Sequence, residues 1–320
     1  MSYKFSIGES AGDGIRRMAV EQIDRTLEEI ADSGLDRHDT IHQARKHCKK
    51  IRALLRLGRG DLDGGSAVYE RENKCFRDAS RALSEARDAE VLVETFDMLA
   101  ETFGDQIDLD RLRSVRASLE ERKAKASGGE ETLEERIARF AEAIGRARER
   151  VADWPIGDDF GSLGPGLEKT YKRGRRALES VAGEPATANF HEWRKRVKYH
   201  RYHVRVLRSV WEDVLDAWRD ALHDLSDLLG DDHDLAVFGK TLSEERGRFD
   251  SKRDVQALLG LADRRRAQLQ AKAFPLGRRA FAEKPGHLVR RFETYWAAAR
   301  SDIEQHSSKL EANVRVPADD

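Results

Sequence analysis

The sequence predicts an all-α fold, and three observations carry this prediction. The 320-residue chain contains only 6 prolines, while Ala, Leu, Glu and Arg are abundant, as is typical of long helices. Apolar residues recur with helical periodicity, and no segment of useful length alternates apolar and polar residues as a strand would. Regular apolar spacing within a chain that is 37% charged argues against disorder.

The predicted helices follow one another in a fixed order. A first helix is expected over residues 15–32, and a strongly basic helix follows over 41–59. Helical patterns continue from Leu83 and over 133–151, before the strongest break in the chain at Trp154–Gly166, which is rich in Gly and Pro. Beyond this break we expect a helix over 167–181, a second basic helix over 191–208 and a further helical element from Leu229.

The two basic segments stand out, although the whole chain has a formal net charge of -1 from 58 basic and 59 acidic residues. Residues 41–59 contain seven Lys and Arg residues and no acidic one, and residues 191–208 contain seven with the single acidic residue Glu192. The segments therefore carry +7 and +6, and the remainder carries -14. One such segment would indicate a solvated helix face, but two with matching spacing predict an anion-binding surface.

The basic segments are copies of one pattern. Seven residues of the first recur as the same type 149 positions later: His42, Arg45, Lys46, Lys49, Arg52, Arg56 and Arg59 match His191, Arg194, Lys195, Lys198, Arg201, Arg205 and Arg208. A second match, displaced by 146 positions, relates Leu83–Val91 to Leu229–Val237. The sequence therefore predicts an internal duplication of a helical unit of about 150 residues, longer than the period of a solenoid repeat.

The break between the copies divides the chain. We expect a first helical-bundle half over residues 8–154, a linker over 155–166 and a second half over 167–313. Each half would be a bundle of roughly four helices. No apolar run approaches the roughly 20 residues that span a bilayer, and the N-terminus lacks a secretion-signal pattern, so we expect a cytoplasmic protein with no membrane partner.

The spacing also sorts each basic helix into two faces. The seven repeated positions fall within an arc of roughly 140°. Apolar residues such as Cys48, Ile51 and Trp193 lie off that arc and should anchor the helix. His42 and His191 lie close to the predicted helix N-termini, where phosphate is favoured. A cap or core side chain is the alternative for either histidine, but the recurrence favours a binding role. The expected N-caps are Asp39 or Thr40 and Thr187 or Asn189.

These residues resemble the CHAD family, the conserved-histidine α-helical domain. The similarity rests on the H-x-x-R-K-x-x-K-x-x-R helices at His42 and His191 and on the L-x-x-x-R/H-D-x-x-V elements at Leu83 and Leu229. It implies two four-helix bundles related by a pseudo-two-fold axis, which together form one CHAD domain with long basic helices lining a central groove. Some family members follow a triphosphate-tunnel domain with an E-x-E-x-K strand, and because that motif is missing here we expect a stand-alone CHAD protein.

The resemblance further implies non-catalytic binding of inorganic polyphosphate and association with polyphosphate granules. The binding residues that it implies lie on the two basic helices and at the start of the second half: His42, Arg45, Lys46, Lys49, Arg52, Arg56, His191, Arg194, Lys195, Lys198, Arg201 and Arg205, with Arg173 and Arg175 as additions. Asp88 and Asp234 are interpreted as structural partners of nearby basic groups.

Nucleic acid is the alternative polyanion. Polyphosphate offers no bases, so its binder needs a cationic groove but no stacking platform, whereas grooves for single strands normally add aromatic residues. The first basic helix contains no aromatic residue, and only Tyr202 of the second lies near the basic face. We therefore favour polyphosphate and keep RNA or single-stranded DNA as the alternative.

A metal-dependent phosphohydrolase is the second alternative, because His-Asp pairs occur at residues 38–39, 223–224 and 233–234. Metal ligation needs several such side chains to converge, and basic surroundings would repel a divalent cation. No Gly-rich phosphate loop or nucleophile motif is present, and Cys48 and Cys75 alone cannot form a zinc site. We therefore expect no catalytic residue, no metal and no cofactor.

Overall fold

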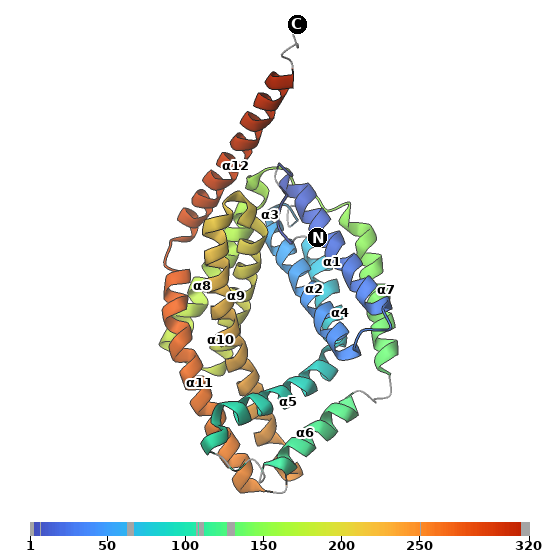
Figure 1. The fold of residues 1–320 in the computed structure, drawn as a ribbon, viewed down its shortest axis with the longest axis vertical. Coiled ribbons are helices and arrows are strands. Elements are labelled where there is room, and N and C mark those ends of the chain that lie inside the picture. The colour runs from blue at the N-terminus through green and yellow to red at the C-terminus, as the bar shows by residue number, and fades with distance from the viewer. Residues whose placement is uncertain are drawn as a thin grey trace.

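All regular secondary structure is helical in the part of the chain that the computed structural model describes, which is residues 3–6, 8–62, 67–106, 108, 112–126, 132–249 and 251–314. This confirms the all-α prediction (Figure 1). The first half contains α1 (Ala11–Ala31), α2 (Arg37–Leu57), α3 (Arg59–Leu62), α4 (Val68–Ala82), α5 (Ser84–Phe103), α6 (Arg113–Ala126) and α7 (Leu133–Val151). The second contains α8 (Gly164–Gly183), α9 (Thr187–Leu207), α10 (Glu212–Glu244), α11 (Lys252–Ala280) and α12 (Pro285–Val314).

Local sequence signals set several helix boundaries. The Ser10 hydroxyl accepts a hydrogen bond from the Asp13 amide at the start of α1, and Thr132 and Glu135 form a capping box at the start of α7. Leu83 separates α4 from α5. Its match in the second half, Leu229, lies inside the 33-residue helix α10, so the two halves differ in where their helices break.

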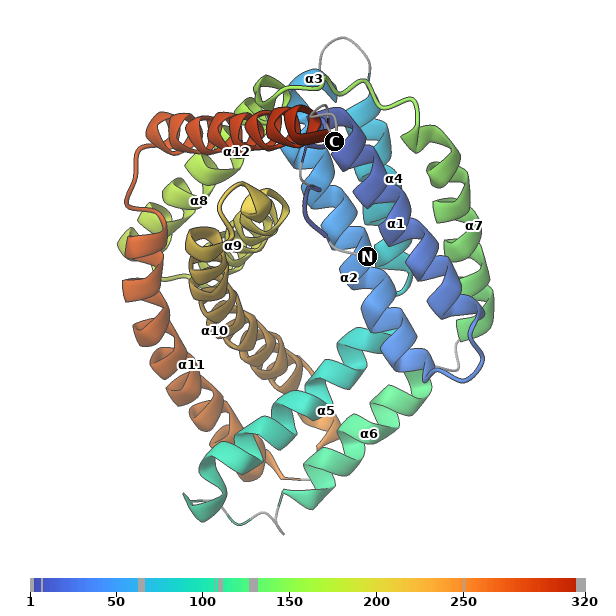
Figure 2. The same ribbon diagram turned by 45° about the horizontal axis from the view of Figure 1, so that its top comes forward.

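Two hydrophobic cores hold the helices together. The larger core combines α1, α2, α4 and α7 with α8, α9, α12 and the first half of α10, and it buries Phe76, Trp154 and Trp193. The smaller core joins α5 and α6 to α11 and the second half of α10, around Leu99 and Phe238. Each core contains helices from both halves of the chain, so the halves are not self-contained bundles; α5 and α6 extend from the first half to α10 and α11 (Figure 2).

This arrangement surrounds the middle of the molecule with four helices. α2 contacts α9 and α5, and α10 also contacts α9 and α5. Figure 2 shows α2 on one side of the centre, α9 and α10 on the opposite side, and α5 crossing below. The two basic helices, 150 residues apart in sequence at their first residues, therefore both face the centre of the fold.

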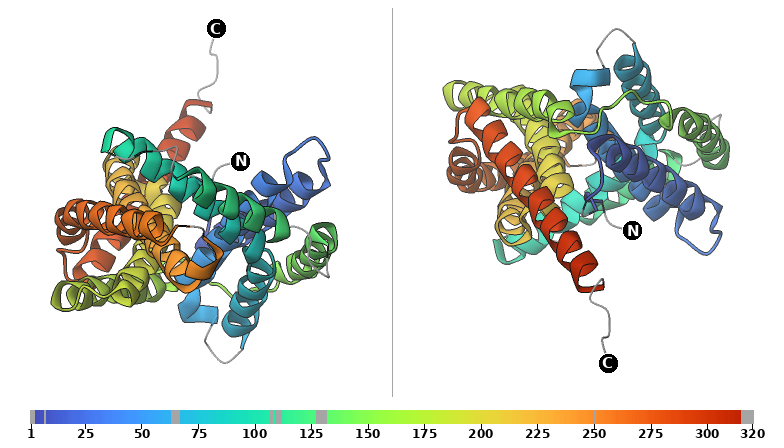
Figure 3. Two further views of the ribbon diagram at one scale, coloured as in Figure 1. Left: turned by 90° about the horizontal axis from the view of Figure 1, so that it is seen from below. Right: turned by 90° about the horizontal axis from the view of Figure 1, so that it is seen from above.

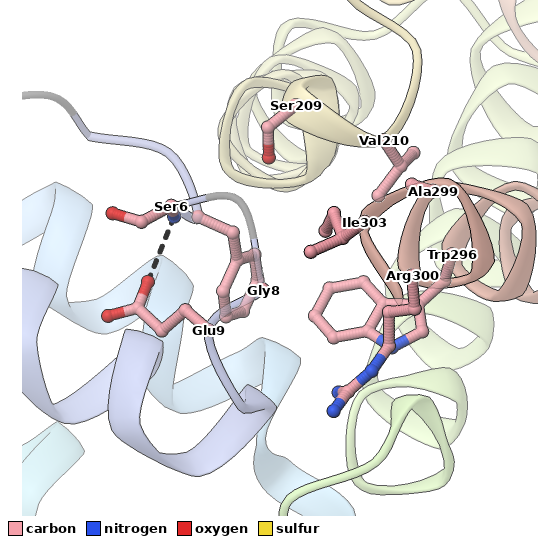
Figure 4. A pocket seen from close by; sticks show the side chains of 10 residues that line it. Ser6, Gly8, Glu9, Ser209, Val210, Trp296, Ala299, Arg300 and Ile303 are labelled. Atoms are coloured by element: carbon pink, nitrogen blue, oxygen red, sulfur yellow. Dashed lines mark hydrogen bonds between the residues drawn. The ribbon is translucent and has the colours of Figure 1, made fainter. Parts of the chain in front are cut away.

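The N-terminal segment packs against the end of α9 and against α12. The Phe5 amide donates to the Val206 carbonyl at 3.0 Å, and the Phe5 ring meets Trp296 of α12 edge-on, with 5.0 Å between ring centres. Figure 4 shows the small apolar pocket that Ser6, Gly8 and Glu9 form with Val210 and α12, and the hydrogen bond from the Ser6 amide to Glu9. From above, α12 runs beside α8 (Figure 3, right). None of the helices described combines the length and apolarity needed to cross a bilayer.

Candidate functional site

The basic helix α2 is fixed at both ends by local interactions. The Asp36 carboxylate accepts hydrogen bonds from the amides of His38 and Asp39, so Asp36 is the N-cap and the predicted caps Asp39 and Thr40 are wrong. α9 begins at Thr187 after Ala186, which makes no side-chain cap bond, so the prediction for α9 is also wrong. Both histidines therefore lie in the second turn of their helices, beyond the free amides of the first turn.

The apolar side of each basic helix is buried, as the spacing predicts. Cys48 and Ile51 of α2 are each 1% exposed, and Trp193 and Val197 of α9 are fully buried. Burial raises the pKa of Cys48 to about 12, so this thiol stays protonated and has no nucleophilic character at neutral pH. With their apolar sides in the core, α2 and α9 turn their basic faces toward the centre of the fold.

A cavity of about 640 Å³ lies at this centre, between α2, α5, α9 and α10. Seven Arg and Lys residues line it, together with three histidines and four aspartates. The described lining residues are His42, Arg45, Lys46, Lys49, Arg87, Asp88, Val91, Arg194, Lys198, Arg201, Tyr202, His223, Ser226, Asp227, Gly230, Asp231, His233 and Asp234.

Half of the sequence-predicted binding residues therefore meet in one cavity. α2 contributes His42, Arg45, Lys46 and Lys49, and α9 contributes Arg194, Lys198 and Arg201. Among the first three Arg and Lys residues of each basic pattern, only Lys195 does not line the cavity. Lys195 instead pairs with Glu192 at 2.6 Å and is 44% exposed.

His191 does not line the cavity itself but contacts His233, which does. Three further predicted residues lie farther along α2 and α9. Arg52 donates to the Asn73 side chain on α4 at 3.1 Å. The Arg56 guanidinium lies 3.9 Å from the centre of the Tyr199 ring. Arg205 lies beside Tyr3 of the N-terminal segment, 5.8 Å from its ring centre. None of these three residues lines the central cavity.

The two additions from α8 also lie elsewhere. Arg173 lines a separate small depression on the surface. The Arg175 guanidinium donates to the carbonyls of Ala282 and Glu283 just beyond the end of α11, so this side chain stabilises the connection to α12 rather than facing the cavity.

Lys49 and Lys198 form the centre of the cationic lining. They occupy matched positions of the two sequence patterns. Burial, then Arg45 and Arg194, lower the pKa of Lys49 to about 8. Burial, followed by Arg194 and Lys49, lowers the pKa of Lys198 to about 7. Neither ammonium group forms an ion pair with any residue that the structure describes. A buried like-charged pair of this kind is destabilised until an anion arrives.

Two arginines in the cavity have long ion pairs, again at matched positions. Arg45 lies 3.9 Å from Asp88, and Arg194 lies 4.0 Å from Asp234. From the sequence we expected these two aspartates to partner nearby basic groups, without naming which ones. Arg45 also donates to the Ser80 carbonyl at 2.7 Å. The pairing orients the guanidinium groups at the edge of ion-pair range, which leaves their other N–H groups available to a ligand.

Three histidines at the basic helices and α10, His42, His191 and His233, have lowered pKa values and are neutral at pH 7. The Nδ1 atoms of His191 and His233 are 3.0 Å apart, so one ring donates and the other accepts, and the two cannot both be doubly protonated. Burial and Arg194 lower the pKa of His233 to about 3. Partial desolvation and Arg87 lower the pKa of His42, and burial and Lys195 lower that of His191. As neutral rings they can still donate one hydrogen bond each.

Sequence reasoning missed the wall that faces the basic helices. α10 contributes His223, Asp227 and Asp231, and α5 contributes Arg87. The Asp231 carboxyl has a raised pKa because of burial and the neighbouring Asp234 and Asp227. Two sequence signals fell on this wall: the Leu83 and Leu229 match, which marks positions 87–88 and 233–234, and the His-Asp pair at residues 223–224, which was considered only as a metal site.

The His-Asp pairs read from the sequence do not pair as neighbours in the chain. His223 lies 2.7 Å from Asp227, one helical turn away, rather than pairing with the adjacent aspartate. Arg201 Nη1 lies 3.7 Å from the same Asp227 carboxylate. In the residues for which the structure gives side chains, no three His, Cys, Asp or Glu side chains are grouped so that they could hold a metal ion.

Comparisons with known proteins agree with this architecture. The family model described as the CHAD domain matches residues 17–243. Among solved structures, the chain resembles the crystal structure of the CHAD domain from the plant Ricinus communis, with a TM-score of 0.59 and 19% sequence identity over 87% of this chain and 94% of that one. At this identity the likeness supports the fold alone. No curated protein matches the sequence. Because the family model spans most of the chain, including both basic helices and the cavity between them, the protein belongs to the CHAD family.

Proposed function

We propose that the central cavity binds inorganic polyphosphate and that the protein is a non-catalytic binding module for this polymer. The observation that carries the proposal is the meeting of Lys49 and Lys198 with Arg45 and Arg194 in one cavity. The two lysines have no carboxylate partner among the described residues, and both arginine ion pairs are at least 3.9 Å long. A dense anion would supply the missing negative charge.

The chemistry of the lining favours phosphate chains over nucleic acid. Apart from histidine rings, the only aromatic side chain among the described lining residues is Tyr202, which is 6% exposed. Single-strand binders normally present open aromatic surfaces on which bases stack. Lys and Arg without such surfaces suit a polymer that offers phosphate oxygens along its whole length. The volume of about 640 Å³ lies within the usual range of ligand pockets.

The proposed binding residues are those that line the cavity. Lys46, Lys49 and Lys198 act as ammonium donors, whereas Arg45 and Arg194 present guanidinium groups that can hold two phosphate oxygens at once. Arg87 and Arg201 add positive charge to the lining, but Arg87 is paired with Glu90 and Glu94, and Arg201 lies beside His223 and Asp227. His42 completes the set as a neutral donor. The other sequence-predicted residues are left out of this site because they do not line it.

The decisive experiment replaces the two central lysines. In the full chain, Lys49→Gln with Lys198→Gln should weaken binding of long polyphosphate by about 100-fold, because two charge-assisted contacts are lost. Lys240→Gln with Lys272→Gln is the matched control: both residues are exposed, and the change in net charge is the same. Equal losses in the two double variants would refute the cavity as the binding site, since a general charge effect would then be enough.

Two further measurements separate this proposal from its alternatives. Single-stranded DNA and transfer RNA should compete poorly with polyphosphate at moderate salt, and equal competition would favour a nucleic-acid function. Incubation of the protein with polyphosphate and divalent metal should release no phosphate; sustained turnover would favour a phosphohydrolase.

We further propose that this binding directs the protein to polyphosphate granules in the cytoplasm. A fluorescent fusion should colocalise with granules in cells that accumulate the polymer. The Lys49→Gln and Lys198→Gln variant should be diffuse, while the control variant should still colocalise. Granule association of the cavity variant would mean that another surface or partner recruits the protein.

A further inference from the structure

The N-terminal segment, residues 3–6, connects the two basic helices beside the central cavity. The Tyr3 hydroxyl donates to the Lys50 carbonyl of α2 at 2.7 Å. The Tyr3 ring meets the Tyr202 ring of α9 edge-on, with 6.0 Å between ring centres. Tyr202 lines the cavity, and Lys50 directly follows the central residue Lys49. Since Tyr3 is only 3% exposed, its side chain is packed into the junction between α2 and α9.

The rest of this segment is bound to three further places in the fold. The Phe5 amide donates to the Val206 carbonyl at the end of α9 at 3.0 Å. The Lys4 carbonyl accepts a hydrogen bond of 2.9 Å from the Arg17 guanidinium of α1, and the Lys4 ammonium pairs with Glu212 of α10. These contacts fix the backbone on the C-terminal side of the tyrosine and so hold its ring in the junction.

Repulsion between the basic faces opposes the close approach of α2 and α9. Lys49 contributes to the lowered pKa of Lys198, so like charges on the two helices act on each other across the cavity. The other charged and titratable groups that act on these two lysines, or on which the lysines act, come from α2, α5, α9 and α10: Arg45, Arg87, Asp88, Arg194, Arg201 and Asp234, with His42, His191 and His233. Four guanidinium groups and two carboxylates surround the lysines, so separation of α2 from α9 would relieve repulsion.

The contact through Tyr3 complements a direct hydrogen bond between the two helices. Nε2 of the buried His203 ring of α9 donates to the Ala53 carbonyl of α2 at 3.0 Å. A single hydrogen bond leaves two helices free to turn about it. The Tyr3 hydroxyl bonds at Lys50, about one helical turn nearer to the cavity than Ala53. Because two separated contacts fix an orientation, the tyrosine helps to set how the two central lysines face each other.

We propose that Tyr3 is a positioning residue for the central cavity: it holds α2 and α9 at the spacing at which Lys49 and Lys198 bind one polyphosphate chain together. This inference rests on the proposed function, because it concerns the affinity of the same cavity. Tyr3 is not among the residues that line the cavity, so it acts on the anion only through the two helices. Without it, α2 and α9 separate in the free protein, and binding must bring them back together against their repulsion, which costs affinity.

The test compares two substitutions of Tyr3 in the full chain. Tyr3→Leu removes the ring and the hydroxyl but keeps an apolar side chain, whereas Tyr3→Phe removes only the hydrogen bond to the Lys50 carbonyl. At pH 7 the affinity for labelled long-chain polyphosphate, measured by fluorescence anisotropy, should fall about tenfold for Tyr3→Leu and about threefold for Tyr3→Phe. Phe140→Leu is the matched control. Its buried ring belongs to the same core but lies on α7, which packs against α1 and α4, so the affinity should stay within about twofold.

Proton uptake on binding separates positioning from a general loss of stability. When α2 and α9 separate, water reaches Lys49 and Lys198, and their pKa values rise toward the ordinary lysine value. The free protein then holds more protons, so fewer are taken up when polyphosphate binds. At pH 7.5, titration calorimetry in two buffers of different ionisation enthalpy should give less than half of the wild-type uptake for Tyr3→Leu and the wild-type uptake for Phe140→Leu.

The outcomes keep this inference apart from the proposed function. If Lys49→Gln with Lys198→Gln abolishes binding while Tyr3→Leu keeps the affinity and proton uptake of the wild type, the cavity stands and the positioning role fails. Equal losses for Tyr3→Leu and Phe140→Leu, or a loss with wild-type proton uptake, also overturn the positioning role. If the double lysine variant binds as tightly as the wild type, the proposed function fails and the inference with it. Should urea unfolding show that Tyr3→Leu does not fold, Tyr3→Phe decides, and wild-type affinity and uptake in that variant overturn the inference.

Discussion

The low pKa values of the two central lysines predict a steep pH dependence of polyphosphate affinity. In the free protein the pKa is about 8 for Lys49 and about 7 for Lys198, and a bound polyanion should raise both toward the ordinary lysine value of about 10.4. The charged fractions fall from about 0.9 and 0.5 at pH 7 to about 0.09 and 0.01 at pH 9. If both lysines bind only as ammonium ions, the affinity falls by about 500-fold over this range.

The sign of the effect follows from proton linkage. Binding stabilises the protonated lysines, so the complex takes up protons from solution whenever the free lysines are partly neutral. At pH 7.5 the two free lysines together lack about one proton, and binding should take up about that number. In the free protein, His42, His191 and His233 are neutral in this pH range, because their pKa values are all lowered.

Titration calorimetry in two buffers of different ionisation enthalpy measures this proton uptake directly. Fluorescence anisotropy with labelled long-chain polyphosphate measures the affinity from pH 7 to pH 9. The matched variant is Lys49→Arg with Lys198→Arg. Arginine stays charged throughout this range. The affinity of this variant for polyphosphate should therefore change by no more than a few fold between pH 7 and pH 9. Proton uptake near zero at pH 7.5 in the wild-type protein, or the same pH profile in both proteins, would refute the argument that these lysines bind the anion.

Three other outcomes follow from the geometry. Arg45→Gln with Arg194→Gln should weaken polyphosphate binding by about 100-fold, with helical circular dichroism unchanged; a loss of helix would instead show that the ion pairs to α5 and α10 are structural. Gly166→Ala should lower the free energy of unfolding in urea by about 1–3 kcal/mol, because its Cβ would meet the end of α2. Gly183→Ala on the same helix has nothing within 4 Å of its Cβ and should not destabilise the protein. Equal effects of the two substitutions would count against the close contact. Long polyphosphate should raise the midpoint of thermal unfolding more than tripolyphosphate at equal phosphate concentration, since one long chain can contact several cationic groups, and equal shifts would contradict a site built for a polymer.

Residue spacing within single helices predicts which side of each basic helix is buried. The 3.6-residue period separates Cys48, Ile51 and Trp193 from the basic residues of the same helices, and all three are buried in the structure. The match between the two halves also indicates that Asp88 and Asp234 partner basic groups, and both lie at the edge of ion-pair range from arginines at matched positions. The burial pattern depends on neighbours three or four residues apart, whose relative positions a helix fixes. The pairing of the two aspartates joins different helices, and its sequence signal was the match between the two halves.

Only the tertiary structure decides which basic residues meet. Arg173 and Arg175 are two residues apart in the sequence, yet one lines a cationic depression and the other binds carbonyls at the end of α11. Arg52 and Arg56 continue the pattern of Lys49 but face different neighbours, because α2 passes from the cavity to α4 and α9 along its length.

The composition and periodicity of the chain determine that it is helical and that two of its helices are basic on one face and apolar on the other. The fold alone decides that Lys49 and Lys198 are buried together, and that a wall of α10 carboxylates and histidines stands opposite them. The reason is physical: periodicity specifies directions around one helix axis, whereas the charge state of a lysine depends on its distance from water and from every other charge in space.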